Sequence, residues 1–166
     1  KICGLFEGEK YMGIIVCRVD DRLIHGQVAT SWIRGNNIEV VVVVDDRIAK
    51  DATQLSILKV AAPAEVKVYA QSVEKFTEKY KMGILDKYRT MLVFENVYAP
   101  LAENGIPIKT LNLGGMRFKD GRKQITKALS VSEEEERAIH KLHELGVDLE
   151  HRQVMADNKV DVMTLL

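Results

Sequence analysis

Hydrophobic residues along the chain fall in short runs whose spacing alternates between that of strands and that of helices. The run over residues 38–44 is almost entirely β-branched, which is typical of a central parallel strand buried on both faces. Shorter runs predict further strands on either side of it. Strands are expected over residues 14–19, 38–44, 66–70, 90–94, 109–113 and 152–155, with an extended edge segment over residues 125–131.

Segments with helical spacing lie between these runs, and several begin at a residue that caps helices well. Asp51 precedes residues 52–61, where apolar residues recur at helical intervals. Ser132 and Glu135 form a capping box at the start of an acidic helix over residues 133–145. Other helices are expected over residues 28–33, from Ser72 to Gly83, after Pro100, and from Asp157 to Leu166.

The alternation of strands and helices predicts the class of fold. We expect one α/β domain: an open, mostly parallel β-sheet with helices on both faces and an antiparallel strand at one edge. Residues 12–166 carry this pattern, whereas residues 1–11 lack clear periodicity. We therefore expect residues 12–166 to form the domain and residues 1–11 to be a leader or an expression remnant.

Composition narrows the classes of protein. The 24 basic and 24 acidic residues cancel, so no global field attracts nucleic acid or an anionic membrane. The two cysteines form no disulfide framework, which suits a reducing compartment. The longest aliphatic run, residues 40–44, is far shorter than the roughly 20 residues that span a bilayer. We therefore expect a cytoplasmic protein that does not bind nucleic acid.

The most polar junction of the chain lies at residues 18–28, between the first predicted strand and the first predicted helix. A neutral imidazole such as that of His25 is a base, a metal ligand or a nucleophile for phosphoryl groups. Arg22 carries a guanidinium, which matches phosphoryl oxygens, and Gly26 allows close approach of an anion to the backbone. The amides of a helix that starts near Gln27 would point at the same place, and Asp20 or Asp21 would fix the imidazole tautomer or orient an arginine.

Other polar residues follow the predicted strands at the same edge of the sheet. In an open parallel sheet, ligands bind beyond the carboxyl ends of the strands. Besides the His25 loop, three segments lie at such ends: Asp45-Asp46, Glu95-Asn96 and Gly114-Gly115. The fold therefore predicts that these residues converge on one crevice.

Simpler interpretations of the same residues stay open. Asp20 with Arg22, or Asp21 with Arg18, would form surface ion pairs of little energetic value. The acidic pairs are magnesium ligands or, more simply, helix caps. His140 and His143 complement the dipole of their helix better than they begin a metal site, and His151 lies at a strand edge.

The stretch RVDDRLIHGQV, residues 18–28, resembles the signature of the mannose/fructose/sorbose-type IIB components of the bacterial sugar phosphotransferase system. The resemblance continues through DDRIAKD (residues 45–51) and LNLGGM (residues 111–116), and it covers residues 12–166. It implies a phosphohistidine–sugar phosphotransferase. His25 would receive a phosphoryl group from a phosphohistidine of the IIA partner and pass it to a sugar that enters through the membrane partners IIC and IID.

The resemblance also implies roles for the residues around His25. Arg22, Gly26 and Gln27 would hold the phosphoryl group. The loops of the site would be shaped by Arg18, Asp20, Asp45, Gly114 and Gly115. The resemblance implies no metal or organic cofactor, and it implies peripheral association with the membrane transporter. It leaves open the sugar, association into homo-oligomers, and whether IIA is a separate chain.

Two other functions compete with this one. The acids after the first two strands also occur in receiver-like regulatory modules, but such a module needs an aspartate after the third strand. Here that strand ends in Ala70-Gln71. The third possibility is a metal-dependent or small-molecule enzyme that uses His25 as a base.

Overall fold

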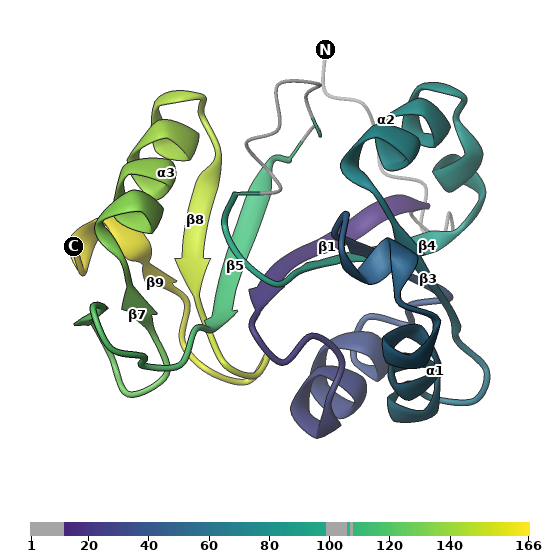
Figure 1. Ribbon diagram of the computed structural model, residues 1–166, viewed down its shortest axis with the longest axis horizontal. Coiled ribbons are helices and arrows are strands. Elements are labelled where there is room, and N and C mark those ends of the chain that lie inside the picture. Colours follow the sequence, from purple (N-terminus) through teal and green to yellow (C-terminus); the bar gives the residue numbers. More distant parts are fainter. Residues whose placement is uncertain (1–11, 99–105, 107) are drawn as a thin grey trace, which may run out of the picture.

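The computed structural model of the protein describes residues 12–98, 106 and 108–166, and its centre is strand β1, Gly13–Asp20. β1 lies inside a seven-stranded sheet of order β3-β2-β4-β1-β5-β8-β9 (Figure 1). Neighbouring strands pair in parallel, except that β9 runs antiparallel to β8 at the edge. The other strands are β2 (Val40–Val44), β3 (Lys67–Gln71), β4 (Arg89–Phe94), β5 (Thr110–Gly115), β8 (Asp148–His151) and β9 (Val160–Asp161). The predicted mostly parallel sheet with an antiparallel edge is confirmed.

Helices cover both faces of this sheet, as predicted. The helix η1 (Val28–Arg34) and α1 (Ala52–Ala61) pack on one face, where Trp32 and Leu58 join a buried cluster with Val41 and Val43. The helices α2 (Val73–Lys81) and α3 (Glu133–Glu144) pack on the other (Figure 1). Because β2 is buried along its whole length, both apolar layers meet on it, as its β-branched run predicts. Short 3₁₀ turns complete the connections at Ile48–Lys50 (η2), Ile84–Lys87 (η3) and Val162–Thr164 (η5).

The caps predicted for α1 and α3 are in place. The side chain of Asp51 accepts a hydrogen bond from the amide of Gln54, at the start of α1. Ser132 and Glu135 form both hydrogen bonds of the capping box that begins α3. Each cap satisfies an amide that the first turn of a helix leaves without an internal partner, so local sequence fixes these helix starts.

Three predicted elements are wrong. Residues 125–131 do not form an edge segment, because the amides of Ile125 and Thr126 both turn back to the carbonyl of Leu129. Only Ser130–Val131 (β7) is extended, and it pairs with Lys123–Gln124 (β6) in a separate two-stranded sheet. The strand expected over residues 152–155 lies earlier, as β8, and the helix expected from Asp157 is replaced by β9 and η5.

The helix expected from Asp157 is absent because the side chain of Asp157 has other partners. Asp157 caps no helix, since its carboxylate accepts from the amides of Gln153 and Val154 and closes a turn after β8.

The first helix also differs from an ordinary α-helix, because η1 is wound as a π-helix, a form that is common at functional sites. Two predictions, those on residues 1–11 and on the helix after Pro100, lie outside the described residues.

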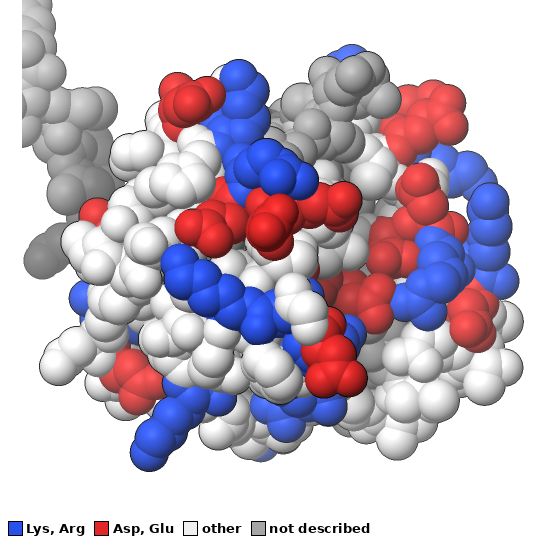
Figure 2. All heavy atoms as spheres, turned by 60° about the vertical axis from the view of Figure 1, so that its left-hand side comes forward, with Lys and Arg blue, Asp and Glu red and all other residues white. Residues whose placement is uncertain are grey.

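The surface of the described part of the chain carries both signs of charge. Figure 2 shows Lys and Arg side chains mixed with Asp and Glu side chains on the face that includes α3, with no extended area of one sign among the described residues there. None of the helices that the structure describes is both long and apolar enough to cross a membrane.

Candidate functional site

The polar stretch of the sequence forms the loop at the carboxyl end of β1, between the ends of β4 and β5. The amide of Leu23 donates to the carbonyl of Asp20, which turns the chain, and the carbonyl of His25 accepts from the amide of Ala29 as the next helix begins. Leu23 is buried and has a φ of 58°, which is uncommon for a residue with a branched side chain. Strained backbone of this kind gathers at functional loops, and here it lies two residues before His25.

The imidazole of His25 is held by a buried carboxylate. Its Nε2 lies 3.1 Å from Oδ2 of Asp20, whose residue has no exposed surface, while the His25 side chain is 18% exposed. Burial alone would raise the pKa of Asp20, but hydrogen bonds from His25 and Arg18 and the charge of Arg18 outweigh it, so the pKa lies below its ordinary value. Asp20 is therefore a carboxylate that accepts a hydrogen bond. Because a carboxylate only accepts, Nε2 of His25 is the donor in this contact, and in a neutral ring with that hydrogen bond the lone pair is on Nδ1.

Arg18 supports Asp20 from inside the sheet. Its Nη2 and Nε lie 2.8 Å and 3.3 Å from Oδ2 of Asp20, in an ion pair whose two side chains are each 1% exposed. Burial lowers the pKa of Arg18, and the charge and hydrogen bond of Asp20 oppose that shift. Burying a guanidinium costs desolvation energy, and hydrogen bonds and ion pairs to its donors must offset that cost. The partners of Arg18 therefore determine whether this arrangement is stable.

The two glycines at the end of β5 make room for this pair. A Cβ on Gly114 would lie 1.8 Å from Cζ of Arg18, so the guanidinium occupies the space that any side chain at position 114 would need. A Cβ on Gly115 would lie 3.2 Å from Oδ2 of Asp20, and the Gly115 carbonyl accepts from the amide of Asp21. The structure thus places both predicted glycines against the loop of His25.

The residues expected to hold a phosphoryl group lie on the outside of the same loop. The amide of Arg22 donates to Oδ1 of Asp20, and its side chain is exposed. Gly26 and Gln27 are exposed as well, and a Cβ on Gly26 would meet no protein atom within 4 Å. The structure therefore leaves the loop open at Arg22 and at Gly26 and Gln27, on either side of His25 in the sequence.

The other segments of the predicted crevice are not all brought to His25. β4 separates β2 from β1, and the Asp45 carboxylate accepts from the amides of Arg47 and Ile48 in its own turn, so it caps that turn. Asp46 caps α2 through the amide of Val73. Glu95 and Asn96 line, with Asp21, a cavity of about 280 Å³ on the α3 side of the loop.

The ion pairs expected from the sequence have different partners. Asp20 binds Arg18 instead of Arg22, and Asp21 binds Arg117 at 3.0 Å instead of Arg18. His140 and His143 lie exposed on α3, whereas His151 ends β8 with its Nδ1 2.6 Å from the carbonyl of Leu113. Within the described residues, no three His, Cys, Asp or Glu side chains group as a metal site would.

Sequence reasoning missed the polar side chains beneath Arg18, namely Asn112 and Glu150. Asn112 lies in the apolar strand β5, and Glu150 lies in β8, and both residues are buried. A polar residue inside a predicted buried strand is the signal that could have found them, because such a group needs a partner in the core.

Comparisons with known proteins identify the family of the chain. Residues 14–166 match the family model of the PTS system sorbose subfamily IIB component. The chain is 41% identical over 157 residues to the fructose-specific EIIB component of Bacillus subtilis, covering 93% of this chain and 96% of that protein. It is 39% identical to the mannose-specific EIIAB component of Escherichia coli, covering 94% of this chain and 49% of that longer protein. The crystal structure of the IIBSor domain of the Klebsiella pneumoniae sorbose permease matches with a TM-score of 0.86 and 35% identity, covering 92% of this chain and 95% of that one.

Proposed function

Because the chain belongs to the sorbose subfamily of the IIB components of the phosphotransferase system, a family that transfers phosphoryl groups during sugar uptake, we propose that His25 is its phosphoryl carrier. The observation that supports this most directly is the contact between Nε2 of His25 and the buried carboxylate of Asp20. It favours the other ring nitrogen, Nδ1, as the site of the phosphoryl group. The receiver-like alternative finds no support, since β3 ends at Gln71 where that function needs an aspartate.

The proposed transfer uses the charge of Asp20. As the Nδ1 lone pair forms a bond to phosphorus, the phosphorus–nitrogen bond of the donor phosphohistidine breaks, and the ring of His25, which keeps its proton on Nε2, becomes a cation. The carboxylate of Asp20 faces that proton and stabilises the positive charge as it develops. In the second step the electron pair returns to Nδ1, a sugar hydroxyl oxygen binds phosphorus, and the hydroxyl proton is released.

Three exposed residues of the loop would hold the phosphoryl oxygens. The guanidinium of Arg22 would pair with them, and the bare backbone of Gly26 would let them approach. Gln27 would add its amide in the first turn of the helix, where amide hydrogens lack partners within the helix. Phosphoryl transfer requires from a protein chiefly positioning and charge stabilisation, and this loop would supply both.

As a IIB component, the chain works with the other components of a sugar phosphotransferase system. We infer that a IIA domain donates the phosphoryl group and that residues 12–166, as one IIB domain, pass it to a sugar at the cytoplasmic face of IIC and IID. In the E. coli relative, the A and B components share one chain. The relatives are named for fructose, mannose, sorbose and N-acetylgalactosamine, so we propose a hexose or hexosamine as the acceptor.

The test is phosphorylation of the purified chain by phosphorylated IIA. Wild-type protein should gain one phosphoryl group that acid removes and base does not, and nuclear magnetic resonance of ¹⁵N-labelled histidine should place it on Nδ1 of His25. His25→Ala should abolish labelling. His140→Ala, which removes an exposed histidine of α3, is the matched control and should be labelled as the wild type is.

Labelling of the His25→Ala variant would refute the assignment of the carrier residue. A phosphoryl group on Nε2 of His25 would leave His25 as the carrier and refute the role given to Asp20.

A further inference from the structure

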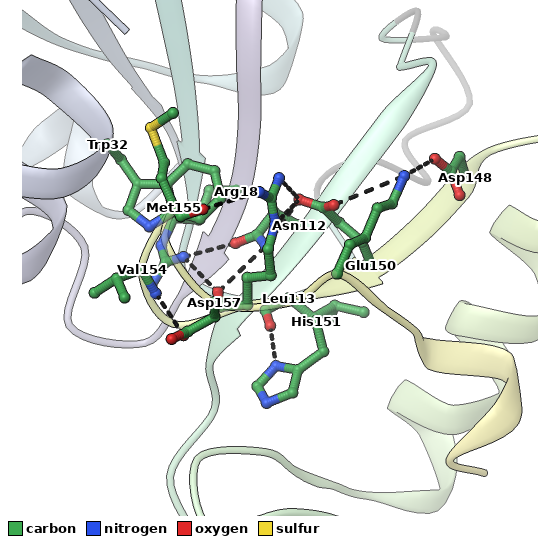
Figure 3. A network of polar contacts seen from close by, with 12 residues as sticks. Arg18, Trp32, Asn112, Leu113, Asp148, Glu150, His151, Val154, Met155 and Asp157 are labelled. Atoms are coloured by element: carbon green, nitrogen blue, oxygen red, sulfur yellow. Dashed lines mark hydrogen bonds and ion pairs between the residues drawn. The ribbon is translucent and has the colours of Figure 1, made fainter. Parts of the chain in front are cut away.

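Arg18 is held by a buried series of hydrogen-bonded side chains from two neighbouring strands, and this buried chain leads to the phosphorylation loop, residues 20–27, which carries His25. Oδ1 of Asn112, on β5, accepts from Nη1 of Arg18 at 2.6 Å. Nδ2 of Asn112 donates to Oε1 of Glu150, on β8, at 3.2 Å. Figure 3 shows these contacts running from Arg18 through Asn112 to Glu150; the ammonium group of Lys159 then lies between Glu150 and Asp148.

The order of donors and acceptors in this chain is fixed. A guanidinium only donates and a carboxylate only accepts, so the amide of Asn112 must present its oxygen to Arg18 and its nitrogen to Glu150. Asn112 is 2% exposed and Glu150 3%, so water does not replace either partner. One orientation of Asn112 therefore satisfies all three groups, and that orientation sets where the guanidinium lies.

A second set of contacts fixes the opposite side of Arg18. Its Cζ lies 4.9 Å from the centre of the Trp32 ring, on the helix that follows His25. Arg152 also lies over Trp32, pairs with Glu150 at 2.8 Å, and accepts at its carbonyl from both Arg18 and Asn112. The buried chain is thus closed into a network that includes the helix beginning at the phosphorylation loop.

We propose that Asn112 and Glu150 are positioning residues for phosphorylation of His25, acting through Arg18 and Asp20. The inference rests on the proposed role of His25 and goes beyond it, because neither side chain touches the imidazole. Arg18 approaches Oδ2 of Asp20, the same oxygen that faces Nε2 of His25. If Arg18 moves, that carboxylate moves, and the imidazole loses the partner that keeps its proton on Nε2.

Isosteric variants test this proposal. Glu150→Gln removes the charge that pairs with Arg152. Because Asn112 and Arg152 both donate to Oε1, the new amide nitrogen would take the place of Oε2 and face the ammonium group of Lys159. Asn112→Asp sets two carboxylates face to face and gives Arg18 a second acid that competes with Asp20. The double variant reverses the polarity of the contact, since an amide at position 150 donates to a carboxylate at position 112. It should recover part of what Asn112→Asp loses.

Two readouts separate positioning from folding. The first is the tautomer of neutral His25, measured by ¹⁵N chemical shifts without any phosphoryl donor. The wild type should show the Nε2–H form, and each single variant should show a mixture. The second is the rate of phosphorylation by phosphorylated IIA, which should fall about tenfold in the single variants, as is usual when a partner that orients a reacting side chain is removed.

Glu144→Gln, the same change at an exposed acid of α3 that pairs with Lys141, is the matched control and should change neither readout. Single variants that stay folded by circular dichroism, with the wild-type tautomer and a rate within twofold of wild type, would overturn the proposal. If the wild type itself accepts no phosphoryl group at His25, the proposed function fails instead, and the tautomer measurement still decides the role of Asn112 and Glu150.

Discussion

Replacing Gly114 with alanine should dislodge Arg18, because a single methyl group would occupy the volume of the guanidinium. The new Cβ would lie 1.8 Å from Cζ of Arg18 and 2.0 Å and 2.1 Å from its two terminal nitrogens. Contacts this short are impossible, and the strand on which Gly114 lies is paired with β1 and β8, so the backbone has little freedom to move away. The side chain of Arg18 must therefore leave its partners.

The expected cost follows from what Arg18 would lose. Separating a buried ion pair by removing one partner typically costs about 3–5 kcal/mol, and overpacking alone costs about 1–3 kcal/mol. We expect Gly114→Ala to lower the free energy of unfolding by about 3–5 kcal/mol. A domain of this size has about 5–15 kcal/mol in total, so the variant should still fold at low temperature. Its rate of phosphorylation should fall about tenfold or more, because Asp20 loses the cation that orients it.

A double-mutant cycle with Arg18→Ala isolates the contact, with urea unfolding as the assay. In protein that lacks the guanidinium, the methyl group has space, so Gly114→Ala should then cost less than about 1 kcal/mol. The two changes would thus be strongly non-additive. Additive costs, or a Gly114→Ala variant with wild-type stability and phosphorylation rate, would refute the reasoning that Arg18 fills the space above Gly114.

Three further variants give sharp outcomes. Gly26→Ala should leave the free energy of unfolding unchanged or raise it by up to about 1 kcal/mol, since the new Cβ would meet no protein atom within 4 Å. The same variant should slow phosphorylation about tenfold, because the methyl group would obstruct the phosphoryl group, and a rate equal to that of the wild type would contradict the role of Gly26. Because the pKa of Asp20 is lowered in the folded protein, the ionised carboxylate stabilises the fold fully above about pH 4, and this stabilisation should be lost as the pH falls through the pKa of Asp20 in the folded state. Asp20→Asn should remove that part of the acid dependence of the free energy of unfolding, measured between about pH 2 and pH 5. Burial raises the pKa of Cys17 to about 12, so in a Cys3→Ser background the thiol should react with a maleimide only after unfolding in urea; fast reaction of the folded protein would show that β1 opens.

Local patterns were enough to predict most of the fold. The β-branched run that forms β2 and the capping box that begins α3 each specify an element from neighbouring residues alone. The strand at β8 was misplaced because its buried face includes Glu150, a charged residue that hydrophobic spacing treats as exposed. A buried charge is explained only by distant partners, and those partners are not visible in a local window of sequence.

The same limit applies to the site. Its position at the carboxyl end of the first strand, and the loop from Asp20 to Gln27, follow from sequence order and fold. Which acid pairs with which arginine does not, because Asp20 and Asp21 are adjacent, and their side chains point to opposite sides of the loop, one toward Arg18 and the other toward Arg117. Pairing depends on the direction in which each side chain leaves the backbone.

The contacts around Arg18 also have a consequence for the order in which the protein matures. Arg18 donates to the carbonyl of Arg152, 134 residues further along the chain, so the two ends of this contact are synthesised far apart in time. While the ribosome is still making the later strands, β1 and His25 have already emerged, but the partners that orient them do not yet exist. Pairings of such long sequence separation form late in folding. We therefore expect a nascent or partly folded chain to be a poor phosphoryl acceptor, so that phosphorylation of His25 would report that β8 has docked.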